Sequence, residues 1–198
     1  ARDVLILAGD HLYRMDYGRL LEVHRAEQAD VTVAVQPVAA EDAARFGILK
    51  LGADGRIRSF VEKPQTPHAL QGFVSRDDPV RPYVGSMGIY AFRAEVLSEL
   101  MAGPYTDFGG DVIPAAIQSH RVFGFPFHGY WADIGTIRAF YDANLALAQP
   151  HPLFSFEDVS GPVFTRPRFL PGSRIYDVKL DRVLLADGCV VQGAEIRS

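Results

Sequence analysis

The chain has 198 residues, of which 48% are apolar and 22% charged, as is usual for a globular protein with one sizeable core or one domain plus a piece of another. A formal net charge of −4 without any basic run argues against a general nucleic-acid binder. The single cysteine, Cys189, argues against a disulfide framework and favours a reducing cytoplasm. We expect neither a membrane span nor a signal peptide.

The first element is the apolar run at residues 4–8, which ends in Gly9-Asp10. Such a run predicts a strand buried on both faces, as in a parallel α/β sheet. Open α/β sheets bind ligands just past the carboxyl ends of their strands, so Asp10 is a candidate for holding a metal ion against phosphates. The alternative is a turn aspartate that caps the next segment.

A βαβ unit is predicted next. Asp16 is placed to cap a helix, because Leu20, Leu21 and His24 follow at helical spacing. The β-branched run at residues 31–35 predicts the second strand, with a right-handed crossover between the two strands.

Further elements follow in alternation. Residues 48–51 and 57–61 predict a hairpin around a glycine-rich turn, and residues 64–82 a surface excursion. A strand is expected at residues 83–92, where Gly85 and Gly88 suggest a bulge or a ligand contact. Helices are expected at about residues 93–101, 107–118 and 136–148.

The composition changes after residue 148. Five prolines between residues 149 and 171 predict a linker, which separates a domain at residues 1–148 from a segment at residues 172–198. That last segment hints at a six-residue period, which suits the first coils of a β-helix. An irregular tail is the alternative.

A second aspartate strengthens the interpretation of the first. Asp133 follows Trp131 and precedes a helix that Thr136 is placed to cap. Two carboxylates at one sheet edge suit Mg²⁺, which prefers oxygen ligands and is often shared with phosphates. Alternatively, Asp133 only caps the helix.

Other candidate binding residues lie on strands. Lys63, stiffened by Pro64, suits a phosphate, and Glu62 suits sugar hydroxyls; the alternative is a solvated surface pair. Gly47 permits close approach of a ligand or merely begins a strand, and Ser86 is a candidate hydrogen-bond donor. The helix dipole suffices to explain Asp111. No zinc-ligand spacing, nucleophile elbow or Walker loop is present in the sequence.

Taken together, these segments resemble the sugar-nucleotide pyrophosphorylases, and within them most closely the ADP-glucose pyrophosphorylases. The resemblance covers roughly residues 3–148 and rests on the number, order and spacing of its motifs, at residues 9–17, 46–48, 61–64, 86–90, 107–109 and 131–136. It implies an α/β fold, namely a Rossmann-like, GT-A-like nucleotidyltransferase with a mixed sheet and flanking helices. The start of a left-handed parallel β-helix would follow.

The resemblance also implies a reaction. ATP and α-D-glucose 1-phosphate would give ADP-glucose and pyrophosphate, in glycogen or starch synthesis. Asp10 and Asp133 would hold Mg²⁺ at the α-phosphate. Lys63 would bind the sugar phosphate, and a further set of residues would contact the glucose: Gly47, Glu62 and Ser86.

Departures from the family pattern lead to further expectations. The glycine-rich nucleotide loop and most of the β-helix are missing from this sequence, so we expect this segment alone to be inactive and its allosteric parent enzyme to be a cytoplasmic homotetramer. Two rivals stay open. One is a family member that uses UTP, dTTP or GTP, and the other is a non-catalytic regulatory subunit, against which the presence of Asp10, Lys63 and Asp133 speaks.

Overall fold

The computed structural model describes residues 2–154, 163–164, 166 and 168–197. The chain forms two compact units, the first with Ala1–Gly9 and Met15–Gly129, the second with Asp10–Arg14 and Tyr130–Ser198. The division of the sequence into a domain at 1–148, a linker at 149–171 and a segment at 172–198 stays a prediction. Linker residues 155–162, 165 and 167 lie outside the described residues.

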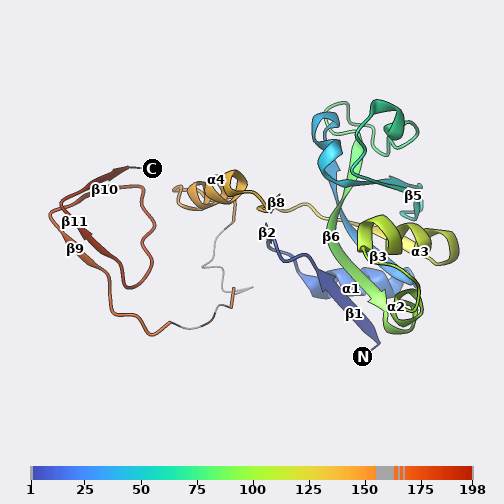
Figure 1. The fold of residues 1–198 in the computed structure, drawn as a ribbon, viewed down its shortest axis with the longest axis horizontal. Coiled ribbons are helices and arrows are strands. Elements are labelled where there is room, and N and C mark those ends of the chain that lie inside the picture. The colour runs from blue at the N-terminus through green and yellow to red at the C-terminus, as the bar shows by residue number, and fades with distance from the viewer. Residues whose placement is uncertain (1, 155–162, 165, 167, 198) are drawn as a thin grey trace. The chain divides into compact units, whose positions relative to one another are not determined.

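A mixed six-stranded sheet forms the first unit (Figure 1). Its strands are β1 (Asp3–Leu7), β3 (Val31–Val38), β4 (Gly47–Leu51), β5 (Ile57–Glu62), β6 (Tyr83–Arg93) and β7 (Val122–Pro126). They run in the order β5-β4-β6-β3-β7, with β1 also paired to β6. Only β3 and β7 pair in parallel, whereas the other pairs are antiparallel. The mixed α/β sheet expected from the sequence is therefore confirmed.

The helices of this unit are α1 (Tyr17–Ala26), α2 (Ala94–Met101) and α3 (Ile113–Ser119), with short 3₁₀ turns at Ala40–Arg45 and Pro67–Leu70. Asp16 caps α1 as predicted, because its carboxylate accepts from the Gly18 and Arg19 amides. The helix predicted at 107–118 instead begins with a π turn at Phe108–Val112. The Val112 amide donates to the Asp107 carbonyl, five residues back, which defines the π turn, and Pro114 stands in the first turn of α3, where its missing N–H is tolerated.

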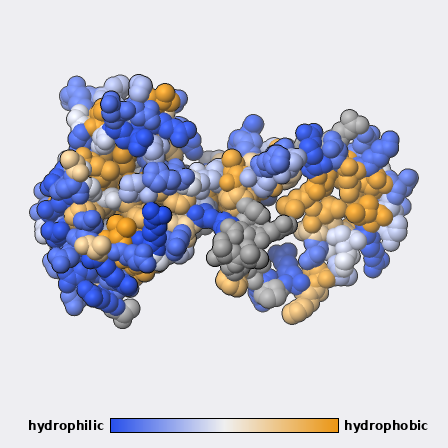
Figure 2. Space-filling model, turned by 180° about the vertical axis from the view of Figure 1, so that it is seen from behind, coloured by the Kyte–Doolittle hydropathy of each residue, from blue (hydrophilic) through white to orange (hydrophobic). Residues whose placement is uncertain are grey.

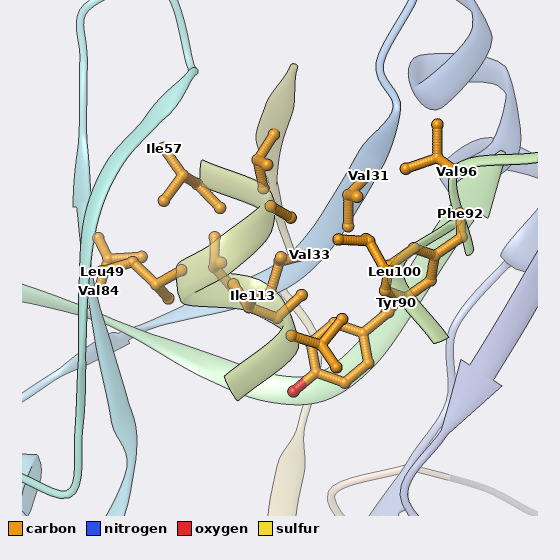
Figure 3. Close-up of a cluster of buried hydrophobic side chains, with 14 residues drawn as sticks. Val31, Val33, Leu49, Ile57, Val84, Tyr90, Phe92, Val96, Leu100 and Ile113 are labelled. Carbon is orange, nitrogen blue, oxygen red and sulfur yellow. The ribbon is translucent and has the colours of Figure 1, made fainter. Parts of the chain in front are cut away.

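Both faces of β3 are covered, because its side chains alternate between two layers. Val31, Val33 and Val35 belong to a core that also contains α2 and α3 side chains such as Leu100 and Ile113 (Figure 3). Thr32 faces the other layer, where its hydroxyl bonds to His24 of α1 at 2.8 Å. The sheet is thus enclosed between α1 on one face and α2 with α3 on the other.

The first strand differs from the prediction. We expected a strand buried on both faces in a parallel sheet, but β1 pairs antiparallel with β6 and is only half-buried, and Leu7 is 43% exposed. The apolar run correctly predicted a strand, yet apolarity alone does not specify the direction of a partner that lies about 85 residues away in the sequence.

Strand β6 carries the interruption that its glycines predicted. Its pairing with β3 shifts register between Val33, which opposes Tyr90, and Val35, which opposes Ser86. Gly88 lies inside this shift with a φ of +66°, a conformation that favours glycine. Its carbonyl accepts from the Ala8 amide at 3.0 Å, so the bulge also anchors the end of β1.

The second unit contains β2 (His11–Tyr13) and β8 (Trp131–Asp133), an antiparallel pair, followed by α4 (Ile137–Leu147). Thr136 caps α4 by accepting from the Ala139 amide. Beyond it, β9 (Arg174–Tyr176) pairs in parallel with β11 (Val190–Gln192), and β10 (Lys179–Asp181) with β12 (Glu195–Arg197). Parallel pairs 16 residues apart in sequence suit a coil, but the left-handed β-helix stays a prediction.

Apolar side chains lie on the surface of the C-terminal segment (Figure 2). The exposed ones include Ile175, Leu180, Leu184 and Val190. The predicted β-helix would account for this exposure, because one coil cannot bury its own apolar face.

Candidate functional site

The first group of candidate residues is the carboxylate pair, Asp10 and Asp133, which the second unit brings together. Asp10 directly precedes β2 and Asp133 ends β8. The strands place His11 opposite Asp133, and the Ile134 amide donates to the Asp10 carbonyl at 2.9 Å. The ladder therefore holds both aspartates by their backbones, although 122 residues separate them in the chain.

Gly135 shows how close the two carboxylates are. A Cβ at this glycine would lie 3.0 Å from Asp133 Oδ1 and 3.2 Å from Asp10 Oδ2. The two oxygens are therefore separated by no more than the sum of these distances. Asp133 Oδ1 also accepts from the Gly135 amide at 2.8 Å, whereas Thr136 and not Asp133 caps α4. The simple capping role is thus filled by another residue.

Two converging carboxylates suit a magnesium ion that completes its octahedron with water and phosphate oxygens. Among the described residues, no group of three histidine, cysteine or acidic side chains forms a metal site of protein ligands alone. The two carboxylates of Asp10 and Asp133 suit Mg²⁺, which usually keeps several non-protein ligands, better than zinc, which needs three or four protein ligands.

The second group lies in the first unit, around the Glu62 carboxylate. Glu62 ends β5 and opposes Gly47 on β4. A Cβ at Gly47 would lie 2.8 Å from Glu62 Oε2, and one at Gly109 would lie 2.9 Å from the same oxygen and 3.4 Å from Asp107 Oδ1. We call Glu62, Lys63 and Asp107, with the two glycines that adjoin them, the Glu62 cluster.

The surroundings of Glu62 in the Glu62 cluster shift the pKa of its carboxyl upward. Burial raises the pKa of Glu62, the neighbouring Asp107 carboxylate raises it further, and Lys63 opposes the rise. The Lys63 ammonium lies 3.7 Å from Glu62 Oε1 and is 63% exposed. A half-desolvated carboxylate next to an exposed cation is more than the solvated surface pair that the sequence left open.

The backbone of Lys63 is fixed while its ammonium stays exposed. Its φ is +42°, an uncommon conformation for a residue with a side chain. The Lys63 amide donates to the Phe46 carbonyl at 3.1 Å, and its carbonyl accepts from Gln65 Nε2 at 2.7 Å. The chain thus holds a strained lysine in place immediately before Pro64.

Ser86 joins this group through Tyr90, four residues along β6. Burial raises the pKa of the Tyr90 hydroxyl, a hydrogen bond from Ser86 opposes the rise, and the Glu62 and Asp107 carboxylates add to it. The Tyr90 ring stacks on Phe108 with centroids 5.9 Å apart. Tyr90 is therefore within electrostatic range of the Glu62 and Asp107 carboxylates, and its ring lies against Phe108.

Asp107 and Tyr90 are the residues that the sequence interpretation missed. Both residues lie in motifs of the family resemblance, at residues 86–90 and 107–109, but the sequence interpretation assigns no site role to either of them. Asp107 also has a structural role, because its carboxylate caps the π turn by accepting from the Gly110 amide. The sequence therefore carries no separate signal for the place of Asp107 beside Glu62.

The structure brings the predicted residues together in two sets. Asp10 meets Asp133 in one compact unit, while Gly47, Glu62, Lys63 and Ser86 gather in the other. Comparison with known families then decides the class of protein. A family model described as nucleotidyl transferase matches residues 1–150. The chain belongs to the nucleotidyl transferase family.

Membership of the nucleotidyl transferase family agrees with the chemical groups at the two sites, namely the carboxylate pair and the Glu62 cluster. Nucleotidyl transfer needs oxygen ligands for a metal and a cation for a phosphate, and it needs no protein nucleophile. The nucleotidyl transferase match covers both carboxylates and the whole Glu62 cluster. Among the described residues, no helix is long and apolar enough to cross a bilayer.

Proposed function

We propose that this chain serves the transfer of an adenylyl group from ATP to α-D-glucose 1-phosphate, which gives ADP-glucose and pyrophosphate. The observation that carries the proposal is the Glu62 cluster, a carboxylate and an exposed ammonium at one strand end, in a member of the nucleotidyl transferase family. Residues 9–17 and 107–109 resemble the ADP-glucose pyrophosphorylases. This resemblance supports ATP as the nucleotide substrate over UTP, dTTP and GTP.

In the proposed reaction, a phosphate oxygen of glucose 1-phosphate attacks the α-phosphorus of ATP. A new phosphorus–oxygen bond forms there, and the bond to the bridging oxygen breaks as pyrophosphate leaves. Lys63 binds the sugar phosphate by its charge, and the fixed backbone around it limits where the ammonium lies. The side chains that orient the sugar are Glu62, Ser86, Tyr90 and Asp107.

Asp10 and Asp133 are the residues that would hold Mg²⁺ in this proposal. The ion would neutralise charge on the reacting phosphates. The backbones of both aspartates are anchored by the β2–β8 ladder, so the position of their Cα atoms does not depend on a ligand.

The sugar half is tested by calorimetric titration of the chain with glucose 1-phosphate, glucose and inorganic phosphate. We expect glucose 1-phosphate to bind most tightly and Lys63→Ala to weaken it at least about tenfold, as loss of a charge-assisted contact does. Lys179→Ala, on an exposed strand of the C-terminal segment, is the matched control. Equal binding by the two variants would refute the role of Lys63.

The nucleotide half is tested by pyrophosphate release with ATP, UTP, dTTP and GTP. Where the gene encodes residues on either side of this chain, the full-length product is used. Preference for ATP supports the adenylyl reaction, and preference for another nucleotide replaces it with the rival. Sugar-phosphate binding without turnover of any nucleotide would support a regulatory subunit.

A further inference from the structure

His11, which follows the candidate metal ligand Asp10, is largely buried and packs against Trp131. Its side chain is 14% exposed, while that of its neighbour Asp10 is 65% exposed. The imidazole meets the Trp131 ring edge to face, with centroids 5.1 Å apart. A largely buried imidazole thus lies directly against an exposed carboxylate.

The two oxygens of Asp10 have different neighbours. His11 Nε2 lies 3.5 Å from Asp10 Oδ1. Asp10 Oδ2 is the oxygen near Gly135, on the side where Asp133 Oδ1 also converges. One oxygen therefore faces a ring nitrogen, and the other is directed to the second carboxylate.

The other ring nitrogen of His11 is buried and makes no hydrogen bond within the part of the chain that the structure describes. A proton on that Nδ1 would be a buried donor without a partner among the described residues. A proton on Nε2, by contrast, faces a carboxylate oxygen. The surroundings of the ring therefore favour the tautomer that donates toward Asp10.

We propose that His11 is a positioning residue that biases the rotation of the Asp10 carboxylate, because Nε2 lies 3.5 Å from Oδ1, an ion-pair distance that is too long for a good hydrogen bond. This leaves Oδ2 free to bind a divalent cation together with Asp133. The inference rests on the proposed function, because that function supplies the cation. The geometry of His11 and Asp10 is independent of it. Groups that orient ligating carboxylates commonly change metal affinity tenfold or more when they are removed.

His11 is not itself placed as a ligand. Mg²⁺ prefers oxygen donors, and His11 with Asp10 and Asp133 does not form a three-residue metal site among the described residues. The alternative role is packing against Trp131 alone. A packing role predicts changed stability with unchanged cation affinity, so the two roles are separable.

The first experiment titrates the chain with Mn²⁺ alone and follows free Mn²⁺ by electron paramagnetic resonance. His11→Phe keeps a ring against Trp131 but removes the donor, and we expect about tenfold weaker binding. His11→Gln places an amide N–H near the position of Nε2 and is expected to restore part of the affinity. His128→Gln, at an exposed histidine, is the control and binds as wild type does.

Asp10→Asn separates the failure of this inference from the failure of the proposed function. If Asp10→Asn binds Mn²⁺ like wild type, the carboxylate pair and the metal part of the proposed function are wrong. If Asp10→Asn loses binding but folded His11→Phe keeps it, only the role of His11 is overturned.

A second measurement on the unmodified chain needs no variant to fold. Nitrogen-15 spectra of the histidine rings at mildly alkaline pH report which ring nitrogen carries the proton. We expect the His11 proton on Nε2, and a proton on Nδ1 would overturn the proposal.

Discussion

Asp10 Oδ2 and Asp133 Oδ1 converge on one point, the place where a side chain on Gly135 would begin. The residue between them must therefore be small. This relationship gives a test of the carboxylate pair that changes neither carboxylate.

Gly135→Ala is expected to weaken Mn²⁺ binding about tenfold, since its methyl group pushes on both carboxylates. The loss of stability should stay below about 1 kcal/mol, because the atoms it meets are the ends of the exposed Asp10 and half-buried Asp133 side chains. Gly172→Ala meets nothing within 4 Å and serves as control. Calorimetry and thermal unfolding measure the two effects, and unchanged Mn²⁺ affinity in Gly135→Ala would contradict the convergence.

Gly109→Ala is expected to lower glucose 1-phosphate affinity without much loss of stability. Its methyl group would press on Glu62 Oε2 at 2.9 Å and on Asp107 Oδ1 at 3.4 Å. Gly47→Ala would collide with the Phe60 ring as well, and overpacking of that kind costs about 1–3 kcal/mol. Gly9→Ala, with open space around it, is the control in titration and unfolding experiments. Equal effects of all three on binding would contradict a site at Glu62.

Glu62→Gln is expected to improve stability and impair binding. Folding raises the pKa of Glu62, first through burial, so its charged form opposes folding above the ordinary pKa near 4.5. Removing that charge should stabilise the fold at neutral pH by roughly a few tenths of a kcal/mol, a small gain because water screens a side chain that is 36% exposed.

The pH dependence gives the sign of this effect. Wild type should lose its disadvantage against Glu62→Gln as the pH falls from the raised pKa of the folded state to the ordinary value near 4.5, because the folded carboxyl takes up its proton first and below that value both states are neutral. Denaturant unfolding of both proteins at several pH values measures the difference. A destabilised Glu62→Gln at neutral pH would show that the carboxylate stabilises the fold instead.

His24 is expected to make the first unit sensitive to acid. Burial lowers the pKa of His24, the Asp3 and Asp30 carboxylates raise it, and the Arg25 and Arg93 guanidinium groups lower it. The folded state therefore favours the neutral ring, and stability falls as the pH drops from the ordinary value of 6.5 toward the lowered pKa.

His24→Asn is the matched variant for this prediction, since its amide retains a partner for the Thr32 hydroxyl. It should cost about 1–2 kcal/mol at neutral pH through lost packing, with a flatter pH profile than wild type. Urea unfolding from mildly acid to mildly alkaline pH gives both slopes. Parallel profiles would exclude His24 as the origin of the acid sensitivity.

Local features of the fold could be predicted from the sequence, because neighbouring residues determine them. Asp16 and Thr136 cap the helices that follow them, and the glycine-rich turn joins β4 to β5. The bulge in β6 follows from Gly88, whose backbone needs no side-chain space. Each of these depends on contacts within a few residues.

Long-range features could not be predicted in the same way. The direction of β1 depends on β6, and the approach of Asp107 to Glu62 depends on a π turn and a strand end that are 45 residues apart in sequence. The spacing of residues along the chain does not predict contacts between segments that are far apart in sequence. The family resemblance selected Glu62, Lys63 and Ser86, but the geometry was needed to add Tyr90.

The pairing of β2 with β8 has a consequence for gene dissection. Residues 10–14 belong to the compact unit that otherwise begins at residue 130, so the boundary between the units is crossed more than once along the polypeptide. A cut at residue 129 would separate the Asp133 strand from its partner and divide the carboxylate pair between two fragments. Modular exchange of the two units would therefore require a circular permutation or a grafted β2 segment, and a simple fusion would not suffice.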